Sequence, residues 1–233
     1  MMDLQQYAVL ENALAPSYGT APNPQFADPS LLGPGTNWQK AIFRSAPMQS
    51  HQVSVSGGND GANYYISGGY LDQQGIVIGS GFKRYTIHTN ANGKIGNWFD
   101  IGTSLSLSRT NENVVLSDNT GIIYNALLNT PDLPVRNADG SFAGPLSYQT
   151  GAVINPVAQA LSITNVLVRN KINGNIYTDI HFFKDLVLRS EIDGDFDFTN
   201  NRFFNPTYSW GDLYSNLTAT LNELNTQITY WGW

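Results

Sequence analysis

The stretch "VLVRNKINGNIYTDIHF", residues 166–182, alternates between apolar and polar side chains along its whole length. Successive side chains of a β-strand point to opposite faces of the sheet, so this pattern predicts a long strand with one apolar and one hydrated face. The apolar positions are Val166, Val168, Ile172, Ile176, Ile180 and Phe182, and the hydrated positions are Arg169, Lys171, Asn173, Asn175, Asp179 and His181.

The segment that follows repeats the alternation, from Leu186 to Phe198. Only "FKD", residues 183–185, separates the two segments, which predicts a tight turn and an antiparallel hairpin. Weaker alternation predicts further strands, which makes about seven in all. They lie at about 49–58, 62–72, 82–93 and 97–111, with a last one beginning near Asn225.

The connections between these strands alternate strictly between short and long. Short turns are expected at Asn59–Asp60, at "GKIG" (93–96) and at "FKD", whereas the other links are longer, at 73–81, 112–165 and 199–224. A meander through a bilayer has short turns on the periplasmic side and long loops outside. The pattern therefore predicts an all-β fold: an antiparallel meander forming part of a transmembrane β-barrel, with long extracellular loops.

Aromatic residues gather beside the short turns, which suits the girdle at a membrane interface. A soluble β-sandwich is the alternative, with the same residues as cross-strand pairs in its core. The residues concerned are Tyr64, Tyr65, Trp98, Phe99, Phe182 and Phe183.

The amino-terminal part differs from the predicted strands in composition. Residues 3–14 have helical spacing, and residues 15–38 are rich in proline and glycine, which predicts a loop. We therefore expect residues 1–45 to be a helix and loop leading into the barrel, and residues 46–233 to be a partial barrel.

Glycines cluster in "SVSGGNDGANYYISGGYL", residues 54–71. Gly57, Gly58 and Gly61 are expected to supply the positive φ values of the turn at Asn59–Asp60. Gly68 and Gly69 lie inside a strand, where glycine marks a bend or a close approach.

The composition excludes several function classes. The chain of 233 residues has 13% charged residues, a net charge of -6 and no cysteine. The absence of a basic run argues against a nucleic-acid partner, and the absence of cysteine excludes a disulfide framework. No nucleophile elbow or phosphate loop is present, and the histidines, His51, His88 and His181, lie on separate strands. The sequence therefore predicts neither an enzyme nor a cofactor.

Acidic residues spaced by two from Glu191 to Asp197 form a ladder on one face of a strand. The metal candidates are Asp193, Asp195 and Asp197, which could gather Ca²⁺ with oxygens from Asn200 and Asn201. A hydrated lumen wall or an extracellular rim explains the same residues, and it is the preferred interpretation.

Several ordered segments resemble the early barrel region of SusC/RagA-type TonB-linked outer-membrane transporters. They are "NWQKAIF" (37–43), "SVSGG" (54–58), "YYISGGYLDQQGIV" (64–77) and "FKRY" (82–85), with "DIGTSLSLSRT" (100–110) and "ALLNTPDLPVRNADGSF" (126–142) further on.

The resemblance implies a segment of an outer-membrane importer of oligosaccharides, other glycans or peptides. It also implies a SusD-like surface lipoprotein, a TonB complex and outer-membrane lipid as partners. A secreted or surface β-sandwich that binds carbohydrate is the alternative function. The family's signal peptide, plug domain and later strands are missing from this sequence, so we expect a fragment that aggregates or needs detergent. The candidates for stacking on substrate are Tyr124, Tyr148 and Trp210.

Overall fold

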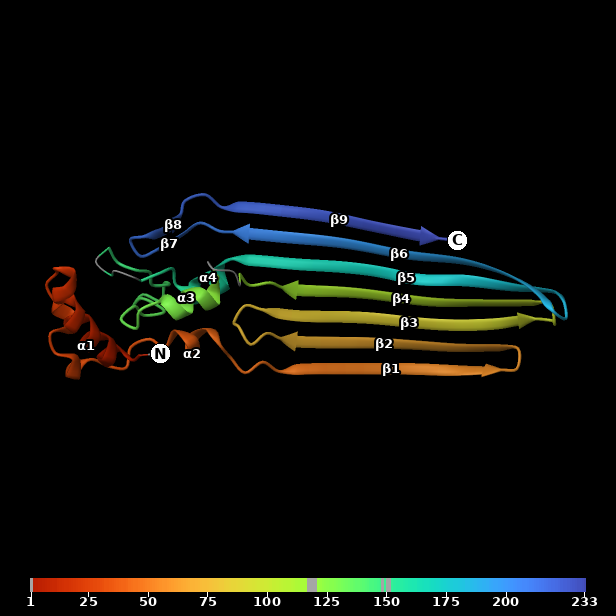
Figure 1. Ribbon diagram of the computed structural model, residues 1–233, viewed down its shortest axis with the longest axis horizontal. Coiled ribbons are helices and arrows are strands. Elements are labelled where there is room, and N and C mark those ends of the chain that lie inside the picture. The colour runs from red at the N-terminus through yellow and green to blue at the C-terminus, as the bar shows by residue number, and fades with distance from the viewer. Residues whose placement is uncertain (1, 117–120, 148, 150–151) are drawn as a thin grey trace.

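The computed structural model describes residues 2–116, 121–147, 149 and 152–233 (Figure 1). Its main element is a seven-stranded antiparallel meander in the order β1-β2-β3-β4-β5-β6-β9. The strands are β1 (Met48–Asn59), β2 (Ala62–Gln74), β3 (Gly81–Ile95), β4 (Phe99–Asn113), β5 (Thr164–Phe183), β6 (Leu186–Asn205) and β9 (Thr220–Gly232). The predicted meander is confirmed.

The short turns lie at one end of the sheet and the long connections at the other (Figure 1). Register places the turns at 60–61, 96–98 and 184–185, one or more residues from their predicted positions. The middle turn begins at Gly96, whose φ is 63°, rather than spanning "GKIG". β6 also runs on to Asn205, through a polar stretch that the alternation did not mark as strand.

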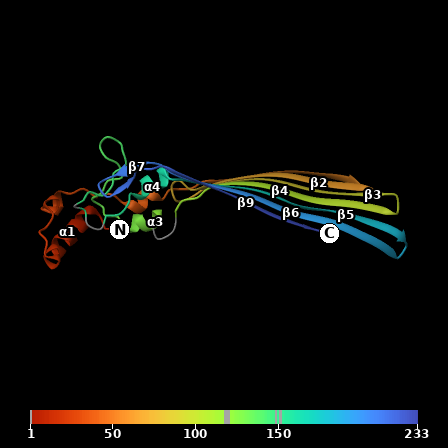
Figure 2. The same cartoon turned by 90° about the horizontal axis from the view of Figure 1, so that it is seen from above.

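The sheet is a single layer, as the view from above shows (Figure 2). The side chains of Ile176, Leu188 and Ile192 are 57%, 53% and 58% exposed, although they are large and apolar. A sandwich would bury such residues under a second sheet, and among the described residues the only other sheet is the small hairpin of β7 (Tyr208–Trp210) and β8 (Tyr214–Asn216). The sandwich alternative is therefore wrong.

Register gives the sheet two chemically different faces from β1 to β6. Paired residues point to the same side, so the pairings Leu107–Ile172 and Ile172–Phe196 continue one apolar face across three strands. The pairing Asn173–Asp195 belongs to the opposite, polar face. On β9 the two faces are exchanged, because Ile228 lies opposite Asp197 on the polar side.

The glycines near the first turn act differently from the prediction. Gly57, Gly58 and Gly61 are not among the glycines with positive φ, so that prediction is wrong. The side chain of Asn59 shapes the turn instead, because its Oδ1 accepts hydrogen bonds from the backbone N–H groups of Gly61 and Ala62, each at 2.9 Å.

Helices and loops gather beyond the long-connection end of the sheet and form a body that we call the head (Figure 1). The head comprises residues 2–45, the connection 75–80, the described parts of the connection 114–163, and the β7–β8 hairpin. Its helices are α1 (Leu4–Leu14), α2 (Trp38–Ile42), α3 (Ile122–Leu128) and α4 (Pro156–Ser162), with 3₁₀ turns η1 (Ala15–Tyr18), η2 (Pro24–Phe26) and η3 (Pro29–Leu31).

The predicted helix at 3–14 is thus confirmed by α1, and α4 was not predicted. Asp3 begins α1 with a reciprocal capping box, in which its side chain accepts from Gln6 N and the Gln6 side chain accepts from Asp3 N. In the described part of the chain, every helix is too short or too polar to span a membrane.

Candidate functional site

The hydrophobic core of the chain lies in the head rather than on the sheet. It joins α2 to the connection 75–80 and to the long connection between β4 and β5. Trp38 and Ile42 of α2 are fully buried in it. The buried members are Trp38, Ile42, Val77, Ile122, Ala126, Leu133, Ala143, Val157 and Ala160.

Hydrogen bonds fix the amino-terminal segment to the long connection. The indole Nε1 of Trp38 donates to the carbonyl oxygen of Thr130 at 2.9 Å. The backbone N–H of Thr36 donates to the carbonyl oxygen of Pro131 at 2.8 Å. The guanidinium of Arg44 donates to the carbonyl oxygens of Gly75 and Ser80, both at 3.1 Å. Segments far apart in sequence therefore form one body.

The Asn155 side chain uses both its donor and its acceptor atoms in the head. It is fully buried, and its Nδ2 donates to the carbonyl oxygens of Val135 and Ala143 at 2.9 and 2.7 Å. Its Oδ1 accepts from the N–H groups of Val157 and Ala158 at the start of α4. Asparagine followed by proline is a helix-start signal, so "NP" at 155–156 could have revealed α4.

The β7–β8 hairpin contacts the long connection through two glycines. A Cβ atom on Gly144 would lie 1.9 Å from the carbonyl oxygen of Trp210, and Gly211 has a φ of 69°. The N–H of Asp212 donates to Pro145 O at 2.9 Å. Only residues without side chains permit this approach, which holds the hairpin against the head.

The polar face of the sheet carries ion pairs between neighbouring strands. Arg189 binds Asp179 through two hydrogen bonds of 2.7 Å, and Lys171 Nζ lies 2.9 Å from Asp195 Oδ2. Arg169 Nε lies 3.6 Å from Asp197 Oδ2. A row of alternating charges therefore lines this face between β5 and β6.

The acidic ladder thus has cationic neighbours at two of its positions, Asp195 and Asp197, while Asp193 approaches Gly232 of β9. Asn200, one of the suggested calcium ligands, lies on the opposite face and donates to Glu223 and Asn225. Within the described ranges, no group of three or more His, Cys, Asp or Glu residues is placed to hold a metal ion.

Known proteins are similar to this chain over most of its length. No protein-family model matches the chain. It is 29% identical over 209 residues to TonB-dependent receptor P26 of Formosa agariphila, and 28% identical over 228 residues to TonB-dependent receptor SusC of Bacteroides thetaiotaomicron. These matches cover 88% and 87% of the chain, but only 20% and 22% of the relatives.

Solved structures of the RagAB peptide transporter have the same fold. One matches 79% of this chain with a TM-score of 0.61 and 25% identity, and it is covered over 21% of its own length. The RagAB peptide importer in its closed-closed state matches 77% of the chain with the same TM-score. The chain is similar over most of its length to TonB-dependent receptors of the SusC/RagA type. It spans about a fifth of the length of these relatives.

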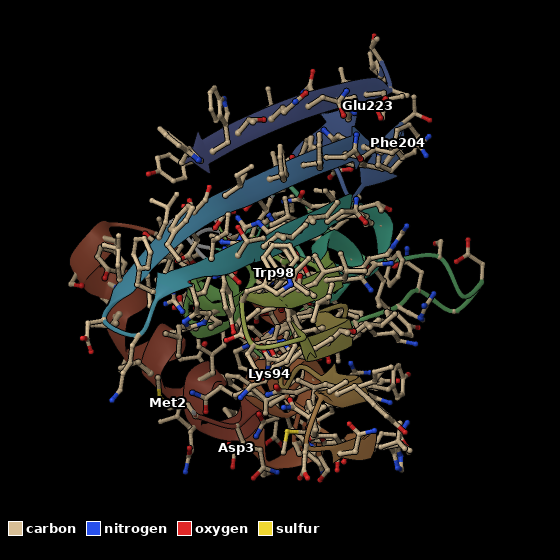
Figure 3. All side chains as sticks on the ribbon, turned by 90° about the vertical axis from the view of Figure 1, so that its right-hand side faces the viewer. Met2, Asp3, Lys94, Trp98, Phe204 and Glu223 are labelled. Carbon is tan, nitrogen blue, oxygen red and sulfur yellow. The ribbon has the colours of Figure 1, made fainter. Side chains whose placement is uncertain are left out.

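The sheet accordingly matches part of an outer-membrane β-barrel. Aromatic side chains lie near the short-turn end, and Trp98 and Phe183 among them are exposed. Figure 3 looks at the receptor segment from this end, with Trp98 labelled. Trp98 is 57% exposed and its ring centroid lies 5.5 Å from that of Phe99, and Phe183 is 75% exposed.

The histidines of the receptor segment do not come together. His51 stacks on Tyr70 across β1 and β2, and His181 Nε2 lies 3.1 Å from Asp100 Oδ2. His88 lies on β3, on the polar face. The neighbouring Asp100 could not be found from the sequence, because register alone brings β4 beside β5.

The aromatic substrate candidates of the receptor lie in different environments. Tyr124 is 45% exposed on α3. Trp210 is only 4% exposed, because Tyr208 stacks on it with ring centroids 3.7 Å apart and planes at 9°. Tyr148 lies outside the described residues.

Proposed function

We propose that the protein is part of a TonB-driven importer that carries oligosaccharides or peptides across the outer membrane without covalent chemistry. The two faces of the sheet from β1 to β6 support this proposal. In a transmembrane barrel the apolar face meets lipid and the polar face lines the lumen. A polar wall with alternating charges is suited to a hydrated substrate path.

The proposal includes two partners: a SusD-like surface lipoprotein over the head, and a TonB complex on the periplasmic side. The similar solved structures are of a two-component importer, RagAB, and one relative is named SusC. Exposed apolar side chains on the head support the proposal of a partner at this end of the sheet. One of them is Leu127 of α3, which is 57% exposed.

Uptake is tested in a strain that lacks the gene. We expect loss of growth on a defined set of oligosaccharides or on peptides, with recovery when the gene is restored. Unchanged growth and uptake on every oligosaccharide and peptide supplied would contradict the importer function.

The partner is tested separately with a photo-crosslinking amino acid at Leu127. We expect a crosslink to the lipoprotein encoded beside the receptor. The matched control is the same amino acid at Phe183, which is exposed at the opposite end of the sheet. Equal crosslinking from both positions would contradict a partner seated on the head.

A further inference from the structure

A cavity of about 590 Å³ lies in the head between the amino-terminal segment and the long connection. α1 and η1 supply Tyr7, Glu11 and Tyr18 to its wall, and the long connection supplies Asp132 and Gln149. Its volume is in the range of small-molecule sites, which are about 300–1,000 Å³.

The cavity is negatively charged and holds no side-chain cation. Glu11 and Asp132 line it, and no Lys, Arg or His occurs among its described lining residues. Nor does any of the residues outside the described ranges have a cationic side chain. Gln149 orients one carboxylate, because its Nε2 donates to Asp132 Oδ2 at 2.8 Å while its Oε1 accepts from Leu146 N.

The phenol of Tyr7 responds to the same surroundings. Burial raises its pKa well above the ordinary value, and the neighbouring carboxylates of Glu11 and Asp132 raise it further. The two carboxylates therefore favour a positive charge at this wall, whereas burial alone disfavours a charge of either sign.

Aromatic rings complete the cavity. Tyr7 packs edge-on against Phe26, with ring centroids 5.8 Å apart, and Tyr18 stands 69% exposed. A cation over such a ring is attracted by its π-electrons, which adds to the attraction of a nearby carboxylate.

We propose that this cavity binds an ammonium or guanidinium group of an organic molecule, with Glu11 and Asp132 as its counter-charges and the tyrosine rings as its walls. Calcium takes six to eight oxygen ligands. Two carboxylates and the aromatic rings fit an organic cation better than a metal ion. The site goes beyond the proposed function, because it exists whether or not the bound molecule is transported.

The test is calorimetric titration of the intact receptor in detergent. The probe is acetyl-Gly-Lys-Gly-amide, whose only charge is the lysine ammonium, and the matched probe is acetyl-Gly-norleucine-Gly-amide, which lacks it. We expect the lysine peptide to bind at least about tenfold more tightly, because hydrogen bonds to charged groups are the strong ones. Equal affinity for the two peptides would overturn the proposal.

Variants locate the binding. The double variant Glu11→Gln with Asp132→Asn keeps the shape of the wall and should weaken the lysine peptide at least about tenfold. Asp60→Asn, in the exposed turn at the opposite end, should leave it unchanged. Unchanged peptide binding in the double variant would overturn the assignment. So would a wild-type receptor that binds calcium instead of the peptide and loses that calcium binding in the double variant.

A second variant covers failure of the double variant to fold. Tyr18→Leu removes an exposed ring and should weaken the lysine peptide several-fold while leaving the norleucine peptide unchanged. Equal effects on the two peptides would refute the role of the ring.

Discussion

The ring of Tyr177 lies over Gly102 on the polar face, where β4 and β5 pair. A Cβ atom on Gly102 would come within 2.4 Å of the ring carbons. The Tyr177 hydroxyl donates to Asn92 Oδ1 at 2.8 Å, and the guanidinium carbon of Arg189 lies 4.7 Å from the ring centroid. The absence of a side chain at Gly102 thus allows one tyrosine to join β3, β4, β5 and β6.

Gly102→Ala should therefore destabilise the receptor. The new methyl group displaces the Tyr177 ring and disturbs its contacts with Asn92 and Arg189, at a cost of about 1–3 kcal/mol. Urea unfolding of the detergent-solubilised receptor, followed by tryptophan fluorescence, measures the change. Gly68→Ala is the matched control, because a Cβ atom there meets no described atom within 4 Å. Equal stability of the two variants would contradict this role of Gly102.

The two faces of the sheet should report different surroundings. The chain has no cysteine, so single cysteines can be labelled with nitroxides at Ile176 and Ile192 on the apolar face and at Asn173 on the polar face. In bilayers we expect the first two labels to be relaxed by oxygen and the third by a water-soluble nickel chelate. The same relaxation at all three positions would be inconsistent with a lipid-facing wall.

Replacement of Asn155 should loosen the head. Asn155→Asp keeps the acceptor for the start of α4 but loses both donors and turns a carboxylate oxygen towards the carbonyls of Val135 and Ala143. We expect a loss of about 2–4 kcal/mol and faster proteolysis of the long connection. Asp28→Ala, which removes an exposed N-cap, should cost at most about 1 kcal/mol. Proteolysis at the wild-type rate in the Asn155 variant would be the contrary result.

Alkaline pH should weaken the head through Tyr7. The pKa of its phenol is raised in the folded state, so the folded chain holds its proton where the unfolded chain releases it. Stability is therefore retained below about pH 10, the ordinary value for tyrosine, and falls as the pH rises beyond it. Melting temperatures at pH 8 and pH 11 should show a smaller alkaline loss in Tyr7→Phe than in the wild type. Tyr124→Phe, at an exposed position, serves as the control and should behave as wild type.

The strands were predictable because one face of a membrane-spanning sheet must be apolar. Alternation of apolar and polar residues along each strand follows from that requirement alone. Ile172 and Asp195 fall on the predicted sides for this reason. The limits of β6 were not predictable, because beyond the apolar band nothing forces residues such as Asn201 to alternate. The prediction of a positive φ at Gly61 was wrong, because the Asn59 side chain supplies hydrogen bonds to the turn that the preference of glycine for positive φ does not take into account.

Most of the structure of the head could not be predicted from sequence patterns. Its contacts join residues many positions apart, such as Trp38 with Thr130, and no local period encodes them. The same holds for the cavity, where Glu11 and Asp132 meet only because two separate segments fold together. Asn155 was recognisable as a helix start, but its bonds to Val135 and Ala143 were not.

The position of the core outside the sheet has a consequence for how the receptor unfolds. The sheet contributes none of the described buried core residues and so depends on its surroundings for stability, whereas the head depends on its own buried residues. Two regions held together by different forces need not lose structure in one transition. Replacement of lipid by a harsher detergent should unfold the sheet first, whereas a chaotrope that leaves micelles intact should unfold the head first.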